Sequence, residues 1–475
     1  MAMLSRLRLR PRPHRPQAAR LSAIVLAGLV LGAVGGGAPA AGAPYASDHV
    51  VVKLVASASA RADAAGLGVG GDVPVGPGLR VLRVAGRSSV AATLNRLRRR
   101  GDVRYAVADY VAHASSAGYV PDDPGRGVPG DWQALQWNFV GPWGLDAPDA
   151  WANLRAAGAP GGLGVTVAVL DTGVAYANHG RFRRSPDFSA PQFRRGYDFV
   201  AHDSHPDDRN GHGTHVAGTI AEATNNGIGL TGLAYGVRLM PVRVLNAQGD
   251  GDASAIAAGV RFAVNHGAQV INLSLEFSRD ITRHDIPELL DALVYAHRRG
   301  VLVVGASGNE GRASVAYPAR ARFVVAVGAT TEHGCLSDFS NGGRRLDLVA
   351  PGGGADANLP GDPRCQPLQP PGRDIYQVTF AGSDPRRFGI PGGYEGTSMA
   401  APHVAATAAL IIASRVLGAH PTPDALLVRL RATARQLGPP GPRAYSRYYG
   451  WGEINAAAAT APASPTPTAG ASPGA

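Results

Sequence analysis

Short apolar runs alternate with longer amphipathic stretches through most of the chain, from residue 136 to residue 459. The apolar runs are rich in Val, Ile, Leu and Ala, and they predict strands at 165–170, 237–244, 270–273, 301–305, 324–327 and 346–349. Helices are predicted between and after these strands, at about 214–223, 253–265, 286–298, 399–415 and 424–434. Continuously apolar strands that are separated by helices are typical of a parallel sheet covered on both faces. The pattern therefore predicts an α/β fold with a doubly wound, mainly parallel sheet.

A smaller unit precedes this region. Strands are predicted at 48–54, 78–84 and 103–112, and a helix is predicted at 90–100. This order, within so short a stretch, predicts a compact α+β module. Gly, Pro and Asp are frequent at 115–135, which predicts a linker, and the low-complexity residues 460–475 predict a disordered tail.

The first 40 residues have the order of a secretory signal peptide. An Arg-rich start is followed by an apolar run at 21–34 and then by small residues that include Ala38-Pro39-Ala40. The apolar run has 14 residues, which is too short for an ordinary transmembrane helix. We therefore expect a secreted protein without a membrane anchor, and an uncleaved anchor is the alternative.

The net charge of +11 is not evenly distributed. Residues 1–40 carry six Arg and no acid, whereas residues 118–475 carry 30 basic and 30 acidic side chains. The positive excess therefore lies in the leader and the small unit, and we expect no nucleic-acid partner.

Two segments carry candidate acid–base residues. Asp171 follows the strand 165–170 and precedes a Thr-Gly turn, which is where parallel sheets place their active sites. His212 lies between two glycines in NGHGTH, just before a predicted helix. His212 and His215 could instead bind a metal ion, but no acid follows at the spacing of a zinc protease.

Two further segments carry a candidate nucleophile and a hydrogen-bond donor. Ser398 begins an apolar helix in GTSMAAPH, where the helix N-terminus favours a developing negative charge. Asn309 follows a strand in GASGNEG, and its amide could donate to an oxyanion. Taken singly, the serine could be a helix cap and the asparagine a turn residue.

Together these segments resemble the subtilisin-like (subtilase) family of serine proteases, in which the order Asp, His, Ser is found. NGHGTHVAGTIA and GTSMAAPHVAA are the most specific matches, and the resemblance covers about 136–458. It implies that Asp171, His212 and Ser398 form a catalytic triad, and that Asn309 is the oxyanion donor. His215 and His403 are then expected to be packed structural residues, as in the family.

The resemblance extends to the small unit, which ends in VADYVAHA and is similar to the ferredoxin-like inhibitory propeptide of subtilases. It implies a self-processing zymogen whose propeptide acts as chaperone and inhibitor, and whose substrates are proteins or peptides. A monomer without an organic cofactor is expected. The predicted boundaries are 1–40 for the signal peptide, 41–114 for the propeptide, 115–135 for the linker, 136–459 for the peptidase domain and 460–475 for the tail.

The resemblance also implies structural calcium. One site resembles the tight calcium site of the family and would use Gln136, Asp187, Thr224, Asn226, Ile228 and Leu230. Oxygen ligands of this kind suit a hard cation, although the loop could be a plain glycine turn. A second site would use Asp198, Asp203 and Asp207, but one carboxylate position of the family is Ala201 here.

The substrate-binding positions that the resemblance implies are Ser274, Leu275, Glu276, Ala306, Ser307, Gly308 and Glu310. Where the family usually has Ser-Leu-Gly, this chain has Ser274-Leu275-Glu276. Two carboxylates at the pocket, from Glu276 and Glu310, would favour Arg or Lys before the scissile bond, unless both are solvated rim charges.

Cys335 and Cys365 are the only cysteines, so a multi-cysteine metal site is excluded. In an exported chain we expect them to form a disulfide, and two free thiols are the alternative.

Two other functions remain open. One is a catalytically silent binding protein with the same fold, and the other is a processing protease dedicated to one substrate.

Overall fold

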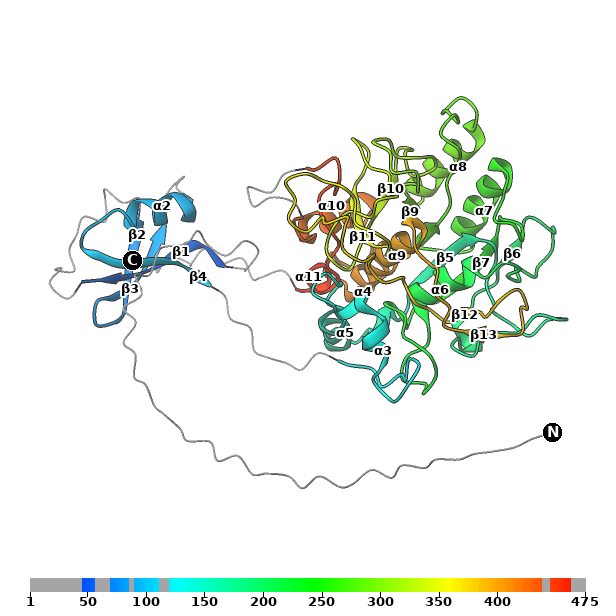
Figure 1. Cartoon of the computed structure of the whole chain (residues 1–475), viewed down its shortest axis with the longest axis horizontal. Coiled ribbons are helices and arrows are strands. Elements are labelled where there is room, and N and C mark those ends of the chain that lie inside the picture. Colours follow the sequence, from blue (N-terminus) through cyan, green and yellow to red (C-terminus); the bar gives the residue numbers. More distant parts are fainter. Residues whose placement is uncertain (1–44, 56–68, 85–88, 111–118, 438–444, 463–475) are drawn as a thin grey trace, which may run out of the picture. The chain divides into compact units, whose positions relative to one another are not determined.

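A computed structural model of the chain describes residues 45–55, 69–84, 89–110, 119–437 and 445–462 (Figure 1). The chain divides into two compact units, Met1–Ala112 and His113–Ala475. The predicted signal peptide, the predicted end of the propeptide near Ala114 and residues 463–475 of the predicted tail lie outside the described residues.

In the residues described, the first unit is an antiparallel sheet packed on helix α2, which confirms the predicted α+β module. The sheet has the order β2-β3-β1-β4, with β1 Tyr45–Leu54, β2 Val69–Gly76, β3 Leu79–Val84 and β4 Val103–Tyr110. Helix α2 (Val90–Leu97) begins at Ser89, whose hydroxyl accepts a hydrogen bond from the Ala92 N–H at 3.1 Å. Leu94 is fully buried and belongs to the same core cluster as Val50 of β1.

The second unit contains a parallel sheet, as predicted, and this sheet has seven strands, one more than the six expected from the sequence. Its order is β11-β10-β9-β8-β5-β7-β6, and every strand pairs with its neighbours in parallel. The strands are β5 Thr166–Asp171, β6 Tyr197–Asp198, β7 Arg238–Arg243, β8 Val270–Leu273, β9 Leu302–Ala306, β10 Val324–Thr330 and β11 Leu348–Pro351. Because the chain passes to opposite sides of β5, the carboxyl ends of β5, β8 and β9 border a crevice of the kind that holds active sites.

Both faces of this sheet are covered, which explains why its strands are apolar throughout. On β5, Val167 and Val169 belong to one core cluster, while Ala168 and Leu170 belong to another. The first cluster contains α6 (His212–Ala221) and α9 (Thr397–Ser414), and the second contains α7 (Ala253–Asn265) and α8 (Pro287–Arg298). The fold is therefore doubly wound.

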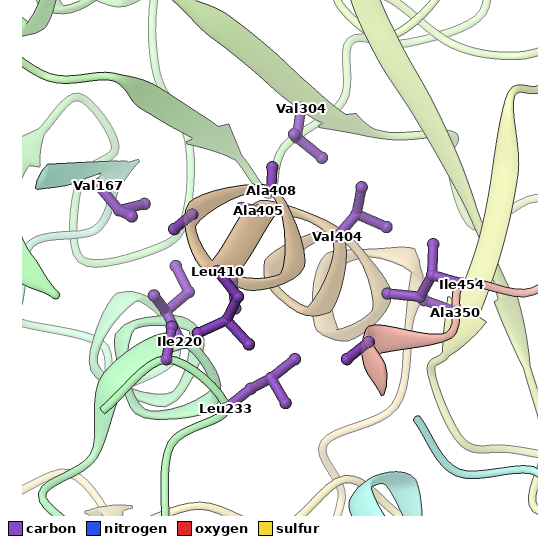
Figure 2. Close-up of a cluster of buried hydrophobic side chains, with 14 of the residues drawn as sticks. Val167, Ile220, Leu233, Val304, Ala350, Val404, Ala405, Ala408, Leu410 and Ile454 are labelled. Carbon is purple, nitrogen blue, oxygen red and sulfur yellow. The ribbon is translucent and has the colours of Figure 1, made fainter. Parts of the chain in front are cut away.

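Helix α9 runs through the centre of the first cluster. Val404, Ala405, Ala408 and Leu410 are fully buried against side chains of the sheet and of α6 (Figure 2). Among the described residues, α9 is the one helix long and apolar enough to cross a membrane by length and composition, and 83% of that stretch is buried. Its apolar character is therefore explained by the core.

Smaller elements complete the second unit. They are helices α3 Trp132–Leu135, α4 Trp137–Val140, α5 Ala147–Ala156, α10 Pro423–Thr433 and α11 Ala456–Thr460, the 3₁₀ turns Pro160–Gly162 and Ala190–Gln192, and a two-stranded ribbon of β12 Thr379–Phe380 and β13 Phe388–Gly389.

The segment predicted as a linker packs against the second unit where the structure describes it. The carboxylate of Asp123 is buried, and the Gly125 N–H donates to the Gly229 carbonyl at 2.7 Å. The fully buried indole of Trp132 donates to the Pro121 carbonyl at 2.9 Å. Residues 119–135 thus form part of the folded unit, although their composition is that of a linker.

Candidate active site

A buried carboxylate holds an imidazole at the carboxyl end of β5. Asp171 is fully buried, and its Oδ1 lies 2.7 Å from Nδ1 of His212, the first residue of α6. Burial lowers the pKa of His212, but the negative charge of Asp171 and its hydrogen bond outweigh burial, so that this pKa lies above its ordinary value. The contact fixes the tautomer with Nε2 directed away from Asp171, where it can accept a proton.

Asp208, which was not predicted from the sequence, orders the turn before His212. One carboxylate oxygen accepts hydrogen bonds from the N–H groups of Asn210 and Gly211 at 2.9 and 3.0 Å. The other accepts from the N–H and hydroxyl of Thr214 at 2.9 and 2.6 Å. An aspartate just before a helix is a frequent capping residue, so the sequence did contain a signal.

The glycine after His212 is required by a close approach of backbone. A Cβ at Gly213 would lie 2.1 Å from the carbonyl oxygen of Gly173, the glycine that follows Asp171 and Thr172. The Gly213 N–H also donates to the Thr172 hydroxyl at 3.0 Å. The two glycine-flanked motifs are therefore in direct contact, which brings the carboxylate and the imidazole together.

Ser398 faces the same crevice from the start of α9. Ser398 and His212 line one cavity of about 440 Å³, together with Ser274 and Leu275. The hydroxyl of Ser398 donates to the Ser274 carbonyl at 3.2 Å, and the Ser274 hydroxyl donates to the Ser398 carbonyl at 2.7 Å. Hydrogen bonds of catalytic groups are often long or misdirected without substrate, so this orientation is compatible with a nucleophile.

The amide of Asn309 is oriented by the residue before Ser398. The N–H and hydroxyl of Thr397 both donate to Asn309 Oδ1, at 2.8 and 2.9 Å, so Nδ2 is turned away from Thr397. A Cβ at Gly396 would lie 3.7 Å from both Asn309 Nδ2 and the Ser398 backbone nitrogen. The two donors predicted for an oxyanion therefore lie near a common point.

His215 and His403 are fully buried and engaged in the core. The imidazole of His215 donates through Nε2 to the Ile375 carbonyl at 2.8 Å and stacks on Tyr394. His403 donates through Nδ1 to the Met399 carbonyl at 2.8 Å. Burial lowers the pKa of each to about 3, so both are neutral, as expected of packed structural residues.

The predicted tight calcium site contains a buried carboxylate. Asp187 is fully buried and accepts from Asn226 Nδ2 and from the Leu230 N–H, both at 2.8 Å. Burial raises the pKa of Asp187, and the nearby charge of Asp123 raises it further. Glu222, which was not predicted as part of this site, is also fully buried, and burial followed by the charge of Asp187 raises its pKa. Buried carboxylate oxygens are hard donors, and a divalent cation bound beside them would stabilise their ionised form.

Other ligands predicted for this site are placed differently. Gln136 is fully buried, but its amide spans Thr231, donating to that residue's carbonyl at 2.7 Å and accepting from its N–H at 3.1 Å. Thr224 and Ile228 lie on the same loop as Asn226, between α6 and β7. Of the predicted loop ligands, Asn226 and Leu230 therefore contact Asp187, whereas the Gln136 amide bonds to Thr231.

The carboxylates predicted for a second calcium site already have protein partners. Buried Arg243 donates to Asp198 at 2.7 Å, and His179 lies 2.8 Å from Asp207. Asp203 accepts from the His205 N–H at 2.7 Å. Within the part of the chain that the structure describes, no three His, Cys, Asp or Glu side chains are grouped to hold a metal ion. Each of the three carboxylates therefore has a protein partner, and the second calcium ion stays a prediction.

The predicted substrate-binding residues fall into two groups. Ser274, Leu275 and Glu276 line the cavity that contains His212 and Ser398. Ala306, Ser307 and Gly308 lie at the end of β9 and are buried, with the Ser307 hydroxyl donating to the Asn341 carbonyl at 2.8 Å. Glu310 pairs with Arg312 at 3.1 Å and is not among the residues that line this cavity.

Cys335 and Cys365 form a disulfide in the structure, as predicted. Both are buried in a third core cluster, which also contains Leu336 and Tyr449. The bridge spans 30 residues of sequence and ties this Gly- and Pro-rich segment to the body of the unit.

Comparisons with known proteins match two parts of the chain to known families. Residues 162–452 match the Subtilase family, and residues 33–109 match the Fervidolysin N-terminal prodomain. The chain is 39% identical over 323 residues to subtilisin Savinase of Lederbergia lenta, and the aligned region covers 67% of this chain and 98% of that protein. It is 35% identical over 331 residues to a thermophilic serine proteinase of Bacillus sp. (strain AK1), covering 70% of this chain and 68% of that protein. Among solved structures, a protease of Pseudoalteromonas arctica PAMC 21717 is similar with a TM-score of 0.57 and 31% identity, covering 72% of this chain and 99% of that one.

Proposed function

This chain belongs to the subtilase family of serine endopeptidases, and on that premise we propose that Asp171, His212 and Ser398 are its catalytic triad. The observation that carries the proposal is the 2.7 Å contact between Asp171 and His212, beside the cavity that His212 shares with Ser398. Each residue has the chemical type that its role requires. The reaction is peptide-bond hydrolysis through an acyl-enzyme intermediate.

In this mechanism His212 transfers the protons. As the Ser398 oxygen attacks the carbonyl carbon of the scissile bond, His212 Nε2 takes the hydroxyl proton and then gives it to the leaving amine. Water subsequently attacks the acyl-enzyme, again with His212 as base, and releases Ser398. Asp171 stays ionised, keeps the proton-bearing Nδ1 oriented and stabilises the imidazolium.

The oxyanion of the tetrahedral intermediate is stabilised by Asn309 Nδ2 and the Ser398 N–H. Thr397 supports this role, because its two hydrogen bonds to Asn309 Oδ1 fix the orientation of the amide before substrate binds. Removal of one such donor costs about 2.7–4 kcal/mol in subtilisin, a member of the same family.

We further propose that the protein is secreted and that its N-terminal unit keeps it inactive until it cleaves itself. The match of residues 33–109 to a protease prodomain supports the zymogen, and the Arg-rich start with its apolar run supports export. Asp187 and the loop 224–230 would hold a structural calcium ion, which would neutralise the buried carboxylates and rigidify the loop.

Active-site labelling combined with one substitution tests the proposal. A fluorophosphonate should label the wild-type protein on Ser398, and Ser398→Ala should abolish both labelling and proteolysis. The Ser398→Ala precursor should also keep its propeptide when it is expressed alone. Labelling that persists in this variant, or normal maturation of it, would show that the proposed nucleophile is wrong.

Casein hydrolysis separates the remaining alternatives. A general endopeptidase should degrade casein extensively, whereas a dedicated processing protease should label with the fluorophosphonate yet leave casein almost intact. A catalytically silent binding protein should neither label nor cleave.

A further inference from the structure

Glu276 places a carboxylate inside the catalytic cleft. It lies three residues after β8 and lines the cavity that also contains His212 and Ser398. Among the described residues that line this cavity there are two carboxylates, Glu276 and Asp250, and neither Arg nor Lys. The cleft beside the nucleophile is therefore negatively charged.

The carboxylate of Glu276 lies directly against the backbone at residues 308–309. Both of its oxygens are 3.2 Å from the Asn309 backbone nitrogen, and Oε1 is 3.4 Å from Asn309 Nδ2. A Cβ at Gly308 would lie 2.4 Å from Oε2, so a residue with a side chain there would displace the carboxylate. Glu276 thus occupies a defined position next to the amide that faces the reacting carbonyl.

Within the part of the chain that the structure describes, the Glu276 carboxylate accepts hydrogen bonds from Asn309 and forms no ion pair. Burial raises the pKa of Glu276, although its hydrogen bonds to Asn309 oppose this effect. Glu310 differs, because its carboxylate is paired with Arg312 and lies outside the cavity lining. Of the two carboxylates considered from the sequence, only Glu276 presents a charge to the cleft that a ligand can neutralise.

We propose that Glu276 selects substrates with Arg or Lys at the residue whose carbonyl Ser398 attacks. This inference rests on the proposed function of Ser398 and Asn309. The attacked carbonyl must lie between those two residues, so the side chain on the same substrate residue begins close to Glu276. A long cationic side chain can replace the weak contact to Asn309 Nδ2 with an ion pair, whereas an acidic one is repelled.

The geometry also couples recognition to catalysis. When a substrate cation draws the Glu276 carboxylate toward itself, Asn309 Nδ2 is released to the oxyanion. A substrate without a cation leaves that amide shared between Glu276 and the oxyanion. We therefore expect part of the preference in kcat and not only in KM.

The test is a set of peptides that differ only at this residue, as Arg, Lys, Gln, Leu, Phe or Glu. Wild-type enzyme matured from the full chain should cleave the Arg peptide about tenfold to a hundredfold faster than the Leu peptide in kcat/KM, the range expected for a hydrogen-bonded charge pair. Glu276→Gln should bring this ratio close to one. The matched variant Glu288→Gln removes the same charge from the exposed first turn of α8, outside the cavity lining, and should keep the preference.

Two results would overturn the inference: Leu or Phe exceeding Arg in the wild type, or an unchanged ratio in Glu276→Gln. If that variant does not mature, inhibition of the wild type still tests whether the pocket is anionic. Benzamidine, a cation, should inhibit more strongly than uncharged benzamide, and its inhibition should weaken as the salt concentration increases. Equal inhibition by both compounds would count against an anionic pocket. Fluorophosphonate labelling of Ser398 in the same samples separates the two proposals, since a labelled enzyme without cation preference contradicts only the role of Glu276.

Discussion

Replacement of Asp123 by Ala should destabilise the loop that follows α6, although Asp123 lies in a segment with the composition of a linker. Its buried carboxylate accepts hydrogen bonds from the backbone N–H groups of Asn225 and Asn226, at 3.0 and 3.2 Å. A buried donor left without an acceptor costs about 1–3 kcal/mol. Two effects make the loss smaller than the sum of two such costs. Asn225 and Asn226 are exposed, so water can accept from their N–H groups in the variant. Burial also raises the pKa of Asp123, so the charged form that accepts these hydrogen bonds is itself disfavoured in the wild type. We expect a net loss of about 1–3 kcal/mol in the free energy of unfolding.

The adjacent residue provides a matched control. Asp122 is exposed and contributes its backbone N–H, not its carboxylate, to Asn225 Oδ1 at 2.7 Å. Asp122→Ala should therefore change stability by less than about 0.5 kcal/mol, and Asp123→Asn should recover part of the loss because its amide oxygen can still accept. Stability would be measured by denaturant unfolding after Ser398 is blocked with a fluorophosphonate, so that self-digestion does not contribute. Equal stability of Asp123→Ala and Asp122→Ala would refute the reasoning.

Two further predictions concern pH and calcium. In the proposed mechanism the base is neutral His212, so kcat/KM should fall as the pH drops through the pKa of His212. Because Asp171 raises that pKa, the loss should begin above the pH at which an ordinary imidazole titrates. A flat profile down to about pH 4 would contradict a histidine base. Excess chelator should shorten the half-life of the wild type on heating but should have little effect on Asp187→Asn, since a ligand at a hundredfold excess over its Kd adds about 2.7 kcal/mol. A wild-type inactivation rate that the chelator does not change would argue against bound calcium.

Elements with a strong apolar or helical pattern could be predicted from the sequence. The strand predicted at 270–273 coincides with β8, because burial on both faces makes it apolar at every position. The helix predicted at 253–265 coincides with α7, because burial of one stripe places apolar residues at helical spacing. Strand β2 was missed because VGGDVPVG combines glycines with a proline, which weaken a strand pattern. Helix α5 was also missed, although Ala147, Ala150, Trp151 and Leu154 are buried at helical spacing.

The candidate site was predictable to the extent that its motifs are local. Asp171 and His212 could be identified because glycines and element ends surround them, and the structure places Asp171 Oδ1 2.7 Å from His212 Nδ1. The partners of Asp123 and of Asp198 could not be identified, since Asn225 is 102 residues from the former and Arg243 is 45 residues from the latter. The Gly, Pro and Asp content of residues 115–135 favours a linker on average. Whether such a segment packs depends on single contacts, here those of the buried Asp123 carboxylate with distant N–H donors.

Helix α6 separates the catalytic geometry from the loop that Asp123 supports. The helix has ten residues, so its ends are about 15 Å apart. His212 at the first residue is held by Asp171 and by the turn that Asp208 orders, whereas the loop after the last residue is held by Asp123 and Asp187. Loosening of the loop therefore removes contacts only at the far end of the helix, and the donors that fix the imidazole are untouched. Loss of Asp123 should consequently lower stability and leave kcat nearly unchanged, and a parallel fall in kcat at a temperature where the variant is fully folded would mean that the helix transmits the disturbance.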